Sequence, residues 1–214
     1  HEFKTPLTLI LSSVESLSNE FKNKGISVNK EISLMYNNSR RLLRLINQLL
    51  DYRKAEDKKF VLRASKTNIL DFSKIIIADF EQEAKKINID FTLATNNPEL
   101  EVYIDHNLMD KVYFNLLSNA FKFTPEKGKI SISIKEDKPN KTVKIYFKDS
   151  GIGIPVNELK EVFNAFYQGS NNYRNSSGIG LHLSKSFIEL HRGRIEINSK
   201  NGAEFIITLP LGNE

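Results

Sequence analysis

Asn115, Asn119 and Lys122 have the residue types and the spacing to bind a phosphorylated ligand. They are four and three positions apart, so on a helix they lie along one face. Amide oxygens suit Mg²⁺ alongside phosphate oxygens, and a nearby lysine neutralises phosphate charge. The alternative is that they form a solvated polar face, and the triplet alone does not exclude it.

A second group, Asp149, Gly151 and Gly153, follows a run typical of a strand. Glycines at a strand end let the backbone turn tightly and approach a ligand. A carboxylate there accepts a hydrogen bond from an exocyclic amine such as that of adenine. Taken alone, the group is better explained as an ordinary turn.

A third group, Gly178, Gly180 and Leu181, leads directly into a helical pattern. A glycine-rich helix start presents free N–H groups and the positive end of the helix dipole, which suits phosphate. The third glycine of a dinucleotide-binding fingerprint is missing, and no Gly-Lys-Ser/Thr follows as in a Walker A motif. This pattern alone is weak evidence.

The first residues, His1-Glu2-Phe3-Lys4-Thr5-Pro6, form the fourth group. A neutral imidazole is a good nucleophile toward phosphorus, and a carboxylate holding its other N–H raises its basicity. His1 and Thr5 share one helix face, and Pro6 is expected to bend the helix. The alternatives are a tag remnant or a polar terminal residue.

Two helices are expected to carry the first of these residues. Apolar residues recur at spacings of three and four on both sides of a break at residues 24–27. The short break predicts an antiparallel hairpin. The second apolar stripe is wider than one partner helix covers, so we expect two hairpins to pair as a dimeric four-helix bundle. Burial of the stripe against the rest of the chain is the alternative. The stripes comprise Leu7, Ile10, Val14, Leu17 and Phe21, then Met35, Asn38, Leu42, Leu45, Leu49 and Tyr52, widened by Leu43, Ile46 and Leu50.

Strand and helix patterns mix in the remaining chain. Helices are expected over 68–86, 107–123 and 180–191, and alternating strands over 89–93, 100–104, 130–134, 143–147, 195–197 and 205–209. Residues 138–141 form a hairpin turn, and residues 169–177 form a loop. One sheet covered by helices on one side predicts a two-layer α/β sandwich. We therefore expect a helical hairpin domain over 1–57 and an α/β domain over 58–214.

The composition narrows the class of protein. The 214 residues contain no cysteine, which excludes disulfides and cysteine-ligated metal sites. No apolar run approaches the roughly 20 residues of a membrane-spanning helix, and no signal peptide is visible. The net charge of +5 is spread among acidic residues rather than gathered in a basic block, which disfavours nucleic acid as a partner.

The order of the motifs is more specific than any one of them. His-Glu-x-x-Thr-Pro, Asn-x₃-Asn-x₂-Lys, Asp-x-Gly-x-Gly, the Phe-rich segment 163–167 and Gly-x-Gly-Leu follow one another along essentially the whole chain. This order resembles the H, N, G and F boxes of sensor histidine kinases. The resemblance implies a Bergerat-type (GHKL) α/β sandwich after the helical hairpin, and an ATP-dependent autokinase of a two-component system.

The resemblance also implies a role for each matching residue. His1 is similar to the phosphoacceptor, Glu2 to the acid that polarises it, and Thr5 to the residue that supports phosphatase action. ATP-binding positions are Asn115, Asn119 (also the Mg²⁺ ligand), Lys122, Asp149, Gly151, Gly153, Arg174, Gly178, Gly180 and Leu181. The implied partners are a second copy of the chain and a response-regulator receiver domain. The implied location is the cytoplasmic portion of a membrane-anchored sensor.

Two departures from the family pattern matter. Ala203 stands where the family commonly has threonine. Family members also carry several helical turns before the phosphoacceptor, so we expect the first helix to fray at His1. A chain with these limits is expected to bind ATP yet phosphorylate itself poorly.

Two rival functions remain open at this point. Gyrase- and Hsp90-like ATPases share the glycine boxes but carry a water-activating glutamate four residues before the metal-binding asparagine. Asn115 stands there, and an amide does not usefully take a proton from water. A catalytically silent dimeric scaffold that docks a regulator is the second rival, although Asn119, Asp149 and the glycines are all present.

Overall fold

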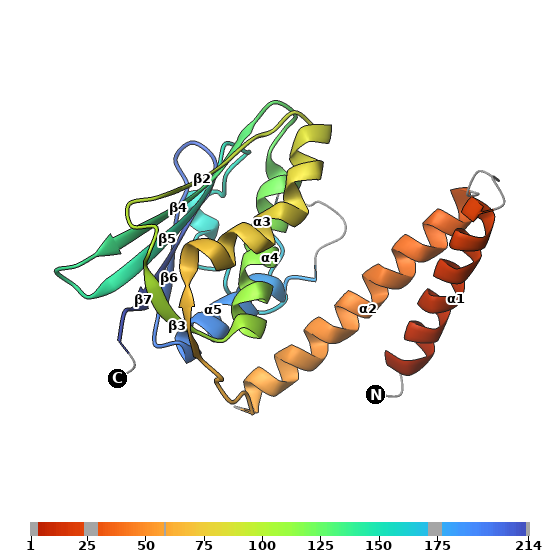
Figure 1. The fold of residues 1–214 in the computed structure, drawn as a ribbon, viewed down its shortest axis with the longest axis horizontal. Helices are drawn as coiled ribbons and strands as arrows, with labels where there is room; N and C mark the ends of the chain where they lie inside the picture. Colours follow the sequence, from red (N-terminus) through yellow and green to blue (C-terminus); the bar gives the residue numbers. More distant parts are fainter. Residues whose placement is uncertain (1–3, 24–29, 58, 171–176, 213–214) are drawn as a thin grey trace. The chain divides into compact units, whose positions relative to one another are not determined.

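The computed structural model describes residues 4–23, 30–57, 59–170 and 177–212 (Figure 1). The chain divides into two compact units, residues 1–59 and 60–214. The first unit contains two helices, and the second combines helices with strands. No helix in the described ranges is both long and apolar enough to cross a bilayer.

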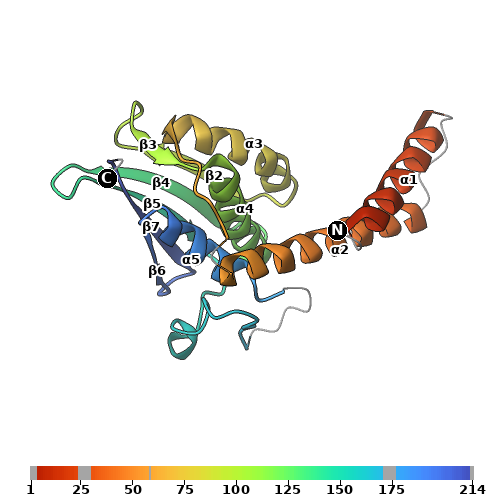
Figure 2. The same ribbon diagram turned by 90° about the horizontal axis from the view of Figure 1, so that it is seen from below.

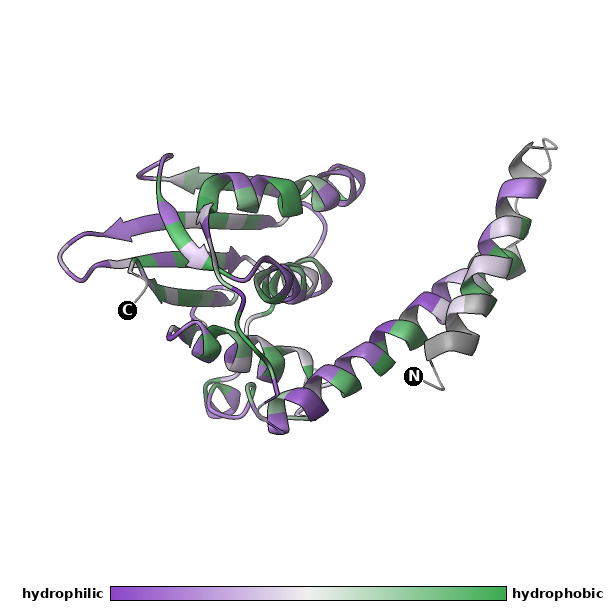
Figure 3. Ribbon diagram, turned by 60° about the horizontal axis from the view of Figure 1, so that its bottom comes forward, coloured by the Kyte–Doolittle hydropathy of each residue, from purple (hydrophilic) through white to green (hydrophobic). Residues whose placement is uncertain are grey.

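The helical unit consists of α1 (Lys4–Asn23) and α2 (Lys30–Glu56), which lie antiparallel and side by side (Figures 1 and 2). Both expected helices are confirmed. Of the described apolar side chains in this unit, Val14 alone is buried. Hydrophobic residues recur along α2, as Figure 3 shows. The large apolar side chains left exposed are Ile10, Leu17, Leu34, Met35, Leu42, Leu49 and Leu50.

A five-stranded sheet in the order β2-β4-β5-β7-β6 forms one layer of the second unit. β2 runs parallel to β4, and every other neighbouring pair is antiparallel. A short turn joins β4 to β5, as the sequence predicts. The strands are β2 (Asp90–Thr95), β4 (Lys129–Asp137), β5 (Thr142–Asp149), β6 (Arg194–Asn198) and β7 (Glu204–Pro210).

Helices α3 (Ile69–Lys86), α4 (His106–Phe123) and α5 (Gly180–Leu190) cover one face of this sheet (Figure 2). Alternation along the strands places apolar side chains on that face. Ile132 pairs with Phe147 and Ile145 with Ile207, and all four are at most 3% exposed. Tyr113 of α4 meets this layer edge-on, its ring centroid 4.8 Å from that of Phe147. The two-layer α/β sandwich is confirmed.

Side-chain caps fix where two of these helices begin. Asn68 accepts hydrogen bonds from the N–H groups of Leu70 and Asp71, and Asp105 accepts from those of Asn107 and Leu108. Such caps satisfy N–H groups that have no partner within the helix. The observed starts lie within one residue of those expected.

The expectation of a single sheet is wrong for residues 100–104. This strand, β3 (Glu101–Ile104), pairs with β1 (Ser65–Asn68) in a separate two-stranded ladder. Val102 and Ile104 are fully buried, so their alternation reports a face turned to the core and not the identity of the partner strand. β1 was not expected, because its sequence, Ser-Lys-Thr-Asn, carries no apolar alternation.

Candidate functional site

The C-terminal half of α4 supplies the polar triplet. One side of α4 is buried against the sheet, and Asn115, Asn119 and Lys122 lie half-buried on the neighbouring side. Asn115 Nδ2 donates to Ser184 Oγ of α5 at 2.9 Å. Lys122 Nζ lies 5.0 Å from the centroid of the Phe123 ring. Asn119 makes no side-chain hydrogen bond within the described part of the chain, so its amide oxygen is available to a ligand or a hard cation.

Asp149 ends β5 and is 6% exposed. Its Oδ1 accepts hydrogen bonds from the N–H groups of Gly151 at 2.8 Å and Ala203 at 3.1 Å. Burial raises the pKa of the Asp149 carboxyl, and the two N–H donors oppose that rise. Its Oδ2 has no hydrogen-bond partner among the described residues. One oxygen therefore fixes the carboxylate in place, and the other is left to accept from a ligand.

Two close approaches require glycine around these side chains. Gly202 has φ +90°, and a Cβ there would collide with the backbone of Asp149. At Gly180 a Cβ would collide with the Asn115 amide. Small residues at these positions therefore let the final turn reach Asp149 and let the start of α5 reach α4.

The start of α5 carries the third predicted group. Ile179 occupies the N-cap position and makes no side-chain capping hydrogen bond, so α5 begins without a side-chain cap from this position. Gly180 and Leu181 form the first turn, and Gly178 precedes it with φ +69°. A helix end of this kind attracts phosphate through its N–H groups and its dipole.

The three groups predicted in this unit meet around the C-terminal half of α4. Gly180 lies against Asn115, and Gly151 lies against the Phe123 carbonyl at the end of the helix. Gly153, two residues further along the same turn, has φ +70° and lies against Ser199. The assembled site offers amide oxygens, a lysine, a buried carboxylate and a helix N-terminus. Together these groups can hold an amine-bearing base at one end and phosphates at the other.

Four predicted residues have no described side chain. His1, Glu2 and Arg174 lie outside the described residues. Thr5 lies in the first turn of α1, but its side chain is also outside the description. Their roles therefore stay predictions.

The sequence did not reveal two supporting residues. Ser184 accepts from Asn115 and donates to the Gly180 carbonyl at 3.0 Å, which links α4 to the start of α5. Glu158 is 8% exposed and accepts from the N–H and hydroxyl of Ser170. Neither follows a helical spacing rule, because Ser184 lies 69 positions from Asn115 and Glu158 lies 12 positions from Ser170.

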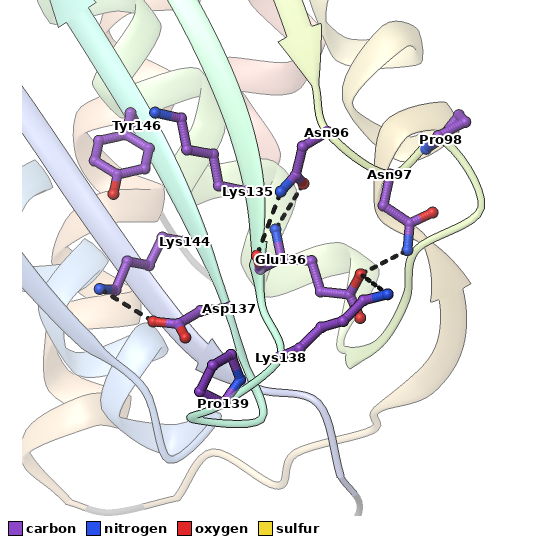
Figure 4. A pocket seen from close by; sticks show the side chains of 10 residues that line it. All are labelled: Asn96, Asn97, Pro98, Lys135, Glu136, Asp137, Lys138, Pro139, Lys144 and Tyr146. Carbon is purple, nitrogen blue, oxygen red and sulfur yellow. Dashed lines mark hydrogen bonds and ion pairs between the residues drawn. The ribbon is translucent and has the colours of Figure 1, made fainter.

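An open cavity lies at the far end of the sheet, beside the turn between β4 and β5 (Figure 4). Two ion pairs lie in its lining: Lys144 Nζ is 3.4 Å from Asp137 Oδ2, and Lys138 Nζ is 3.9 Å from Glu136 Oε2. Asp149 ends β5 at the opposite end of that strand. The cavity is therefore separate from the site around α4.

The described residues contain no cluster of three or more His, Asp or Glu side chains suited to a metal. A cation at this site would instead be held by amide oxygen and by the ligand's own phosphate oxygens. The half-buried Asn119 amide, with no side-chain hydrogen bond of its own, fits that arrangement for Mg²⁺.

Two family models match the chain. "Histidine kinase-, DNA gyrase B-, and HSP90-like ATPase" matches residues 104–213, and "His Kinase A (phospho-acceptor) domain" matches residues 1–58. The first match contains the whole site around α4. The second contains the helical unit and the predicted residues at its start.

Curated relatives align with nearly the whole chain. Histidine kinase P4 of Formosa agariphila is 39% identical over 99% of this chain, and the sensor histidine kinase WalK of Bacillus subtilis is 32% identical over 99%. The chain spans only 16% and 35% of these two relatives.

Solved structures share the fold. The catalytic domain of histidine kinase ThkA is 30% identical with a TM-score of 0.64, covering 70% of this chain and 96% of that domain. ThkA in complex with the response regulator TrrA is 26% identical with a TM-score of 0.70, covering 99% of this chain and 62% of ThkA.

Proposed function

The chain belongs to the histidine kinases, and on this premise we propose that it is an ATP-dependent protein-histidine autokinase of a two-component system. It transfers a phosphoryl group from ATP to His1 and then to an aspartate of a response regulator. The observation that carries this proposal is the convergence on one helix, α4, of an amide, a lysine, a buried carboxylate and an uncapped helix start.

Each group has a distinct part in binding ATP. The unpaired Oδ2 of Asp149 accepts from the exocyclic amine of adenine, while its Oδ1 stays bound to backbone N–H groups. Lys122 and the first turn of α5 bind the phosphates. Asn119 holds Mg²⁺ through its amide oxygen, and the bound ion supplies positive charge that offsets the charge on the phosphate oxygens. Arg174 is proposed to reach the γ-phosphate.

His1 is the proposed nucleophile. An imidazole nitrogen of His1 forms a bond to the γ-phosphorus as the bond from that phosphorus to the β,γ-bridging oxygen breaks, and ADP leaves. Glu2 accepts a hydrogen bond from the other ring nitrogen, which keeps the attacking nitrogen basic. The match of residues 1–58 to a phospho-acceptor domain supports this assignment.

The proposed phosphate acceptor is a receiver-domain aspartate on a separate or fused response regulator. The similar kinase ThkA forms a complex with the response regulator TrrA, which supports a partner of this class. Thr5 is proposed to assist the opposing phosphatase reaction, in which water hydrolyses the regulator's phosphoaspartate and inorganic phosphate is released.

A second copy of the chain is the proposed cover for the apolar faces of α1 and α2. Seven large apolar side chains on these helices are between 39% and 59% exposed. Burying such residues stabilises association by about 1.5–3 kcal/mol for each side chain fully removed from water. A four-helix bundle of two hairpins buries them in the usual way.

The test is incubation, with γ-labelled ATP and Mg²⁺, of the protein extended by the helical turns that family members carry before the phosphoacceptor. We expect an acid-labile, alkali-stable phosphoprotein whose label is lost in His1→Gln. His106→Gln is the matched control, because His106 is an exposed histidine of α4 and should keep the label. Label that survives His1→Gln would refute His1 as the acceptor. Release of free phosphate without any phosphoprotein would favour an ATPase, and bound ATP with neither product would favour a docking scaffold.

A further inference from the structure

A buried histidine outside the ATP site joins two of its helices. His191 follows α5 directly and is 5% exposed. Its Nδ1 lies 2.7 Å from the Phe187 carbonyl oxygen, and its Nε2 lies 2.8 Å from the Asp105 backbone nitrogen. A carbonyl only accepts and a backbone N–H only donates, so Nδ1 carries the hydrogen and Nε2 accepts. Both bonds therefore require the neutral ring.

Asp105 extends this connection to a third segment. Its Oδ1 caps α4 through the N–H groups of Asn107 and Leu108, and its Oδ2 accepts from the N–H of Arg63 at 2.9 Å. Asp105 is 5% exposed, so these acceptors are shielded from water. One residue thus holds α5 through its backbone and holds both α4 and residue 63 through its carboxylate.

Residues 60–64, here called the strap, join α2 to β1 in the sequence. Besides the bond from Arg63 to Asp105, the strap contributes Phe60, whose ring meets Phe187 edge-on with centroids 5.1 Å apart. Phe187 is also the residue whose carbonyl accepts from His191. The strap, α4 and α5 therefore converge on His191 and Asp105.

The same two helices are joined again at the ATP site. Asn115 of α4 donates to Ser184 of α5, close to the first turn of α5. The bond between His191 and Asp105 joins the end of α5 to the start of α4. The two helices therefore run antiparallel and are joined by two hydrogen bonds, one near the ATP site and one at the opposite end of α5. If one of these two hydrogen bonds is lost, only the other still helps to fix the angle between α4 and α5.

We propose that His191 is a positioning residue for the nucleotide site, which holds α4 and α5 at their binding angle while its ring is neutral and lets the strap and the helix pair separate when its ring is protonated. The inference rests on the proposed function, because it assumes that α4 and α5 bind ATP. A protonated Nε2 would present an N–H to the N–H of Asp105, and the acceptor of that bond would be lost.

Burial lowers the pKa of His191, while the hydrogen bond to Phe187 and the charge of Asp105 oppose that shift. The unfolded chain therefore takes up a proton at higher pH than the folded protein. The two hydrogen bonds of His191, here called the latch, contribute stability that is fully present above the ordinary histidine pKa of about 6.5 and falls as pH drops below it. Charged side chains on the surrounding elements are Asp105 at the cap of α4, Lys111 on α4, Glu189 and Arg192 at the end of α5, and Arg63 on the strap.

The test compares the unaltered protein with His191→Gln, whose amide oxygen can accept from Asp105 at every pH. The dissociation constant for MgATP is measured by calorimetry from about pH 5.5 to pH 8. We expect equal affinities at pH 8 and, at the acid end, about threefold to tenfold weaker binding by the unaltered protein than by the variant. Titration of the ATP phosphates affects both proteins alike and cancels in the ratio. A ratio that stays constant across the range would overturn the proposal.

A second readout does not depend on ATP. The amide exchange rate of residues 60–64 in the unaltered protein is divided by that in His191→Gln. This ratio should rise on acidification, because only the unaltered protein loses the bond to Asp105. If the unaltered protein binds no MgATP at any pH, the proposed function fails and this exchange ratio still decides the latch: a rise supports it and a flat ratio refutes it. Asp105→Asn keeps the cap through its amide oxygen but removes both the charge that favours protonation and the acceptor for Arg63, so it is read by MgATP affinity alone. Its acid transition in MgATP affinity should move to lower pH, and no movement would count against the proposal.

Discussion

The helical unit and the α/β unit place their apolar side chains in opposite ways. In the α/β unit, Ile132, Ile145 and Ile207 are at most 1% exposed. In the helical unit, seven large apolar residues of α1 and α2 are 39–59% exposed, and of the described apolar side chains Val14 alone is buried. A sheet and three helices close a core within one chain, whereas two helices leave an apolar face uncovered. From this comparison we expect the α/β unit to be stable by itself and the hairpin to depend on the proposed second copy.

The largest effect should come from the closed core. Ile145→Ala removes a fully buried side chain and leaves a cavity, so the free energy of unfolding of the α/β unit should fall by about 2–5 kcal/mol. Ile75→Ala is the matched control, because Ile75 is 73% exposed on α3 and should change stability by about 0.5 kcal/mol or less. Hydrogen exchange that resolves peptides from each unit measures both. Equal loss of protection in the hairpin would break the comparison.

The next effect tests the uncovered face. Leu42 is 50% exposed, and Leu42→Glu would place a charge in the proposed bundle. The dissociation constant of the dimer should rise by about 100-fold, or about 3 kcal/mol, as measured by analytical ultracentrifugation on dilution. Asn37→Glu adds the same charge at an exposed position of α2 and should leave the dimer intact. If Leu42→Glu also leaves it intact, the apolar face is covered by something other than a second copy.

Asp149→Asn sharpens the comparison, because it separates binding from stability within the closed unit. Asparagine keeps an acceptor for Gly151 and Ala203 but removes the charge, so MgATP affinity should fall by about 1.5–3 kcal/mol in calorimetry. Burial raises the pKa of Asp149, so the folded state binds a proton more readily than the unfolded chain. Stability should therefore fall as pH rises from about 4 through that raised pKa, and this fall should vanish in the variant.

Asp137→Asn is the control of opposite sign. Hydrogen bonds from Asn140, followed by the effect of Lys144, lower the pKa of Asp137. Its contribution to stability is present above the ordinary pKa of about 3.9 and is lost as pH falls through the lowered value. If the free energy of unfolding of the two variants depends on pH in the same way, the environments assigned to Asp149 and Asp137 are wrong.

The smallest effect concerns the hydrogen bond between Asn115 of α4 and Ser184 of α5. Ser184→Ala removes the acceptor for Asn115, and MgATP affinity should fall about fivefold, or about 1 kcal/mol. Ser186→Ala is matched, because Ser186 donates to a carbonyl four residues earlier just as Ser184 does, but no hydrogen bond is seen from it to α4. An equal effect of both substitutions would show that helix propensity, and not the hydrogen bond to Asn115, sets the affinity.

Local patterns allowed most elements of the fold to be predicted. Periodicity predicted α3, α4 and α5 to within one residue at their starts, because caps such as Asn68 and Asp105 lie directly beside the apolar pattern. Alternation predicted six strands, since each has one face turned to the core. The pairing of β3 with β1 was missed, because alternation carries no information about partners and β1 is polar.

The site was predictable where its residues recur in a motif and unpredictable where they act across the fold. The positions of Asn115, Asn119, Lys122 and Asp149 follow from motif order. Ser184 and the His191–Asp105 bond do not, because residues 69 and 86 positions apart meet only after the helices have docked. A serine or histidine in a helix gives no sign of such a partner in its neighbours.

The uncovered face of α1 and α2 also bears on how the protein is made. The hairpin precedes the α/β unit in the chain, so its apolar stripe leaves the ribosome while the sheet is still being synthesised. The α/β unit can bury its own core once complete, but on the proposal that a second copy covers it, the stripe stays exposed until another molecule is available. Biosynthesis of this protein is therefore expected to depend on its own cellular concentration, and chaperones should engage the hairpin before the sheet.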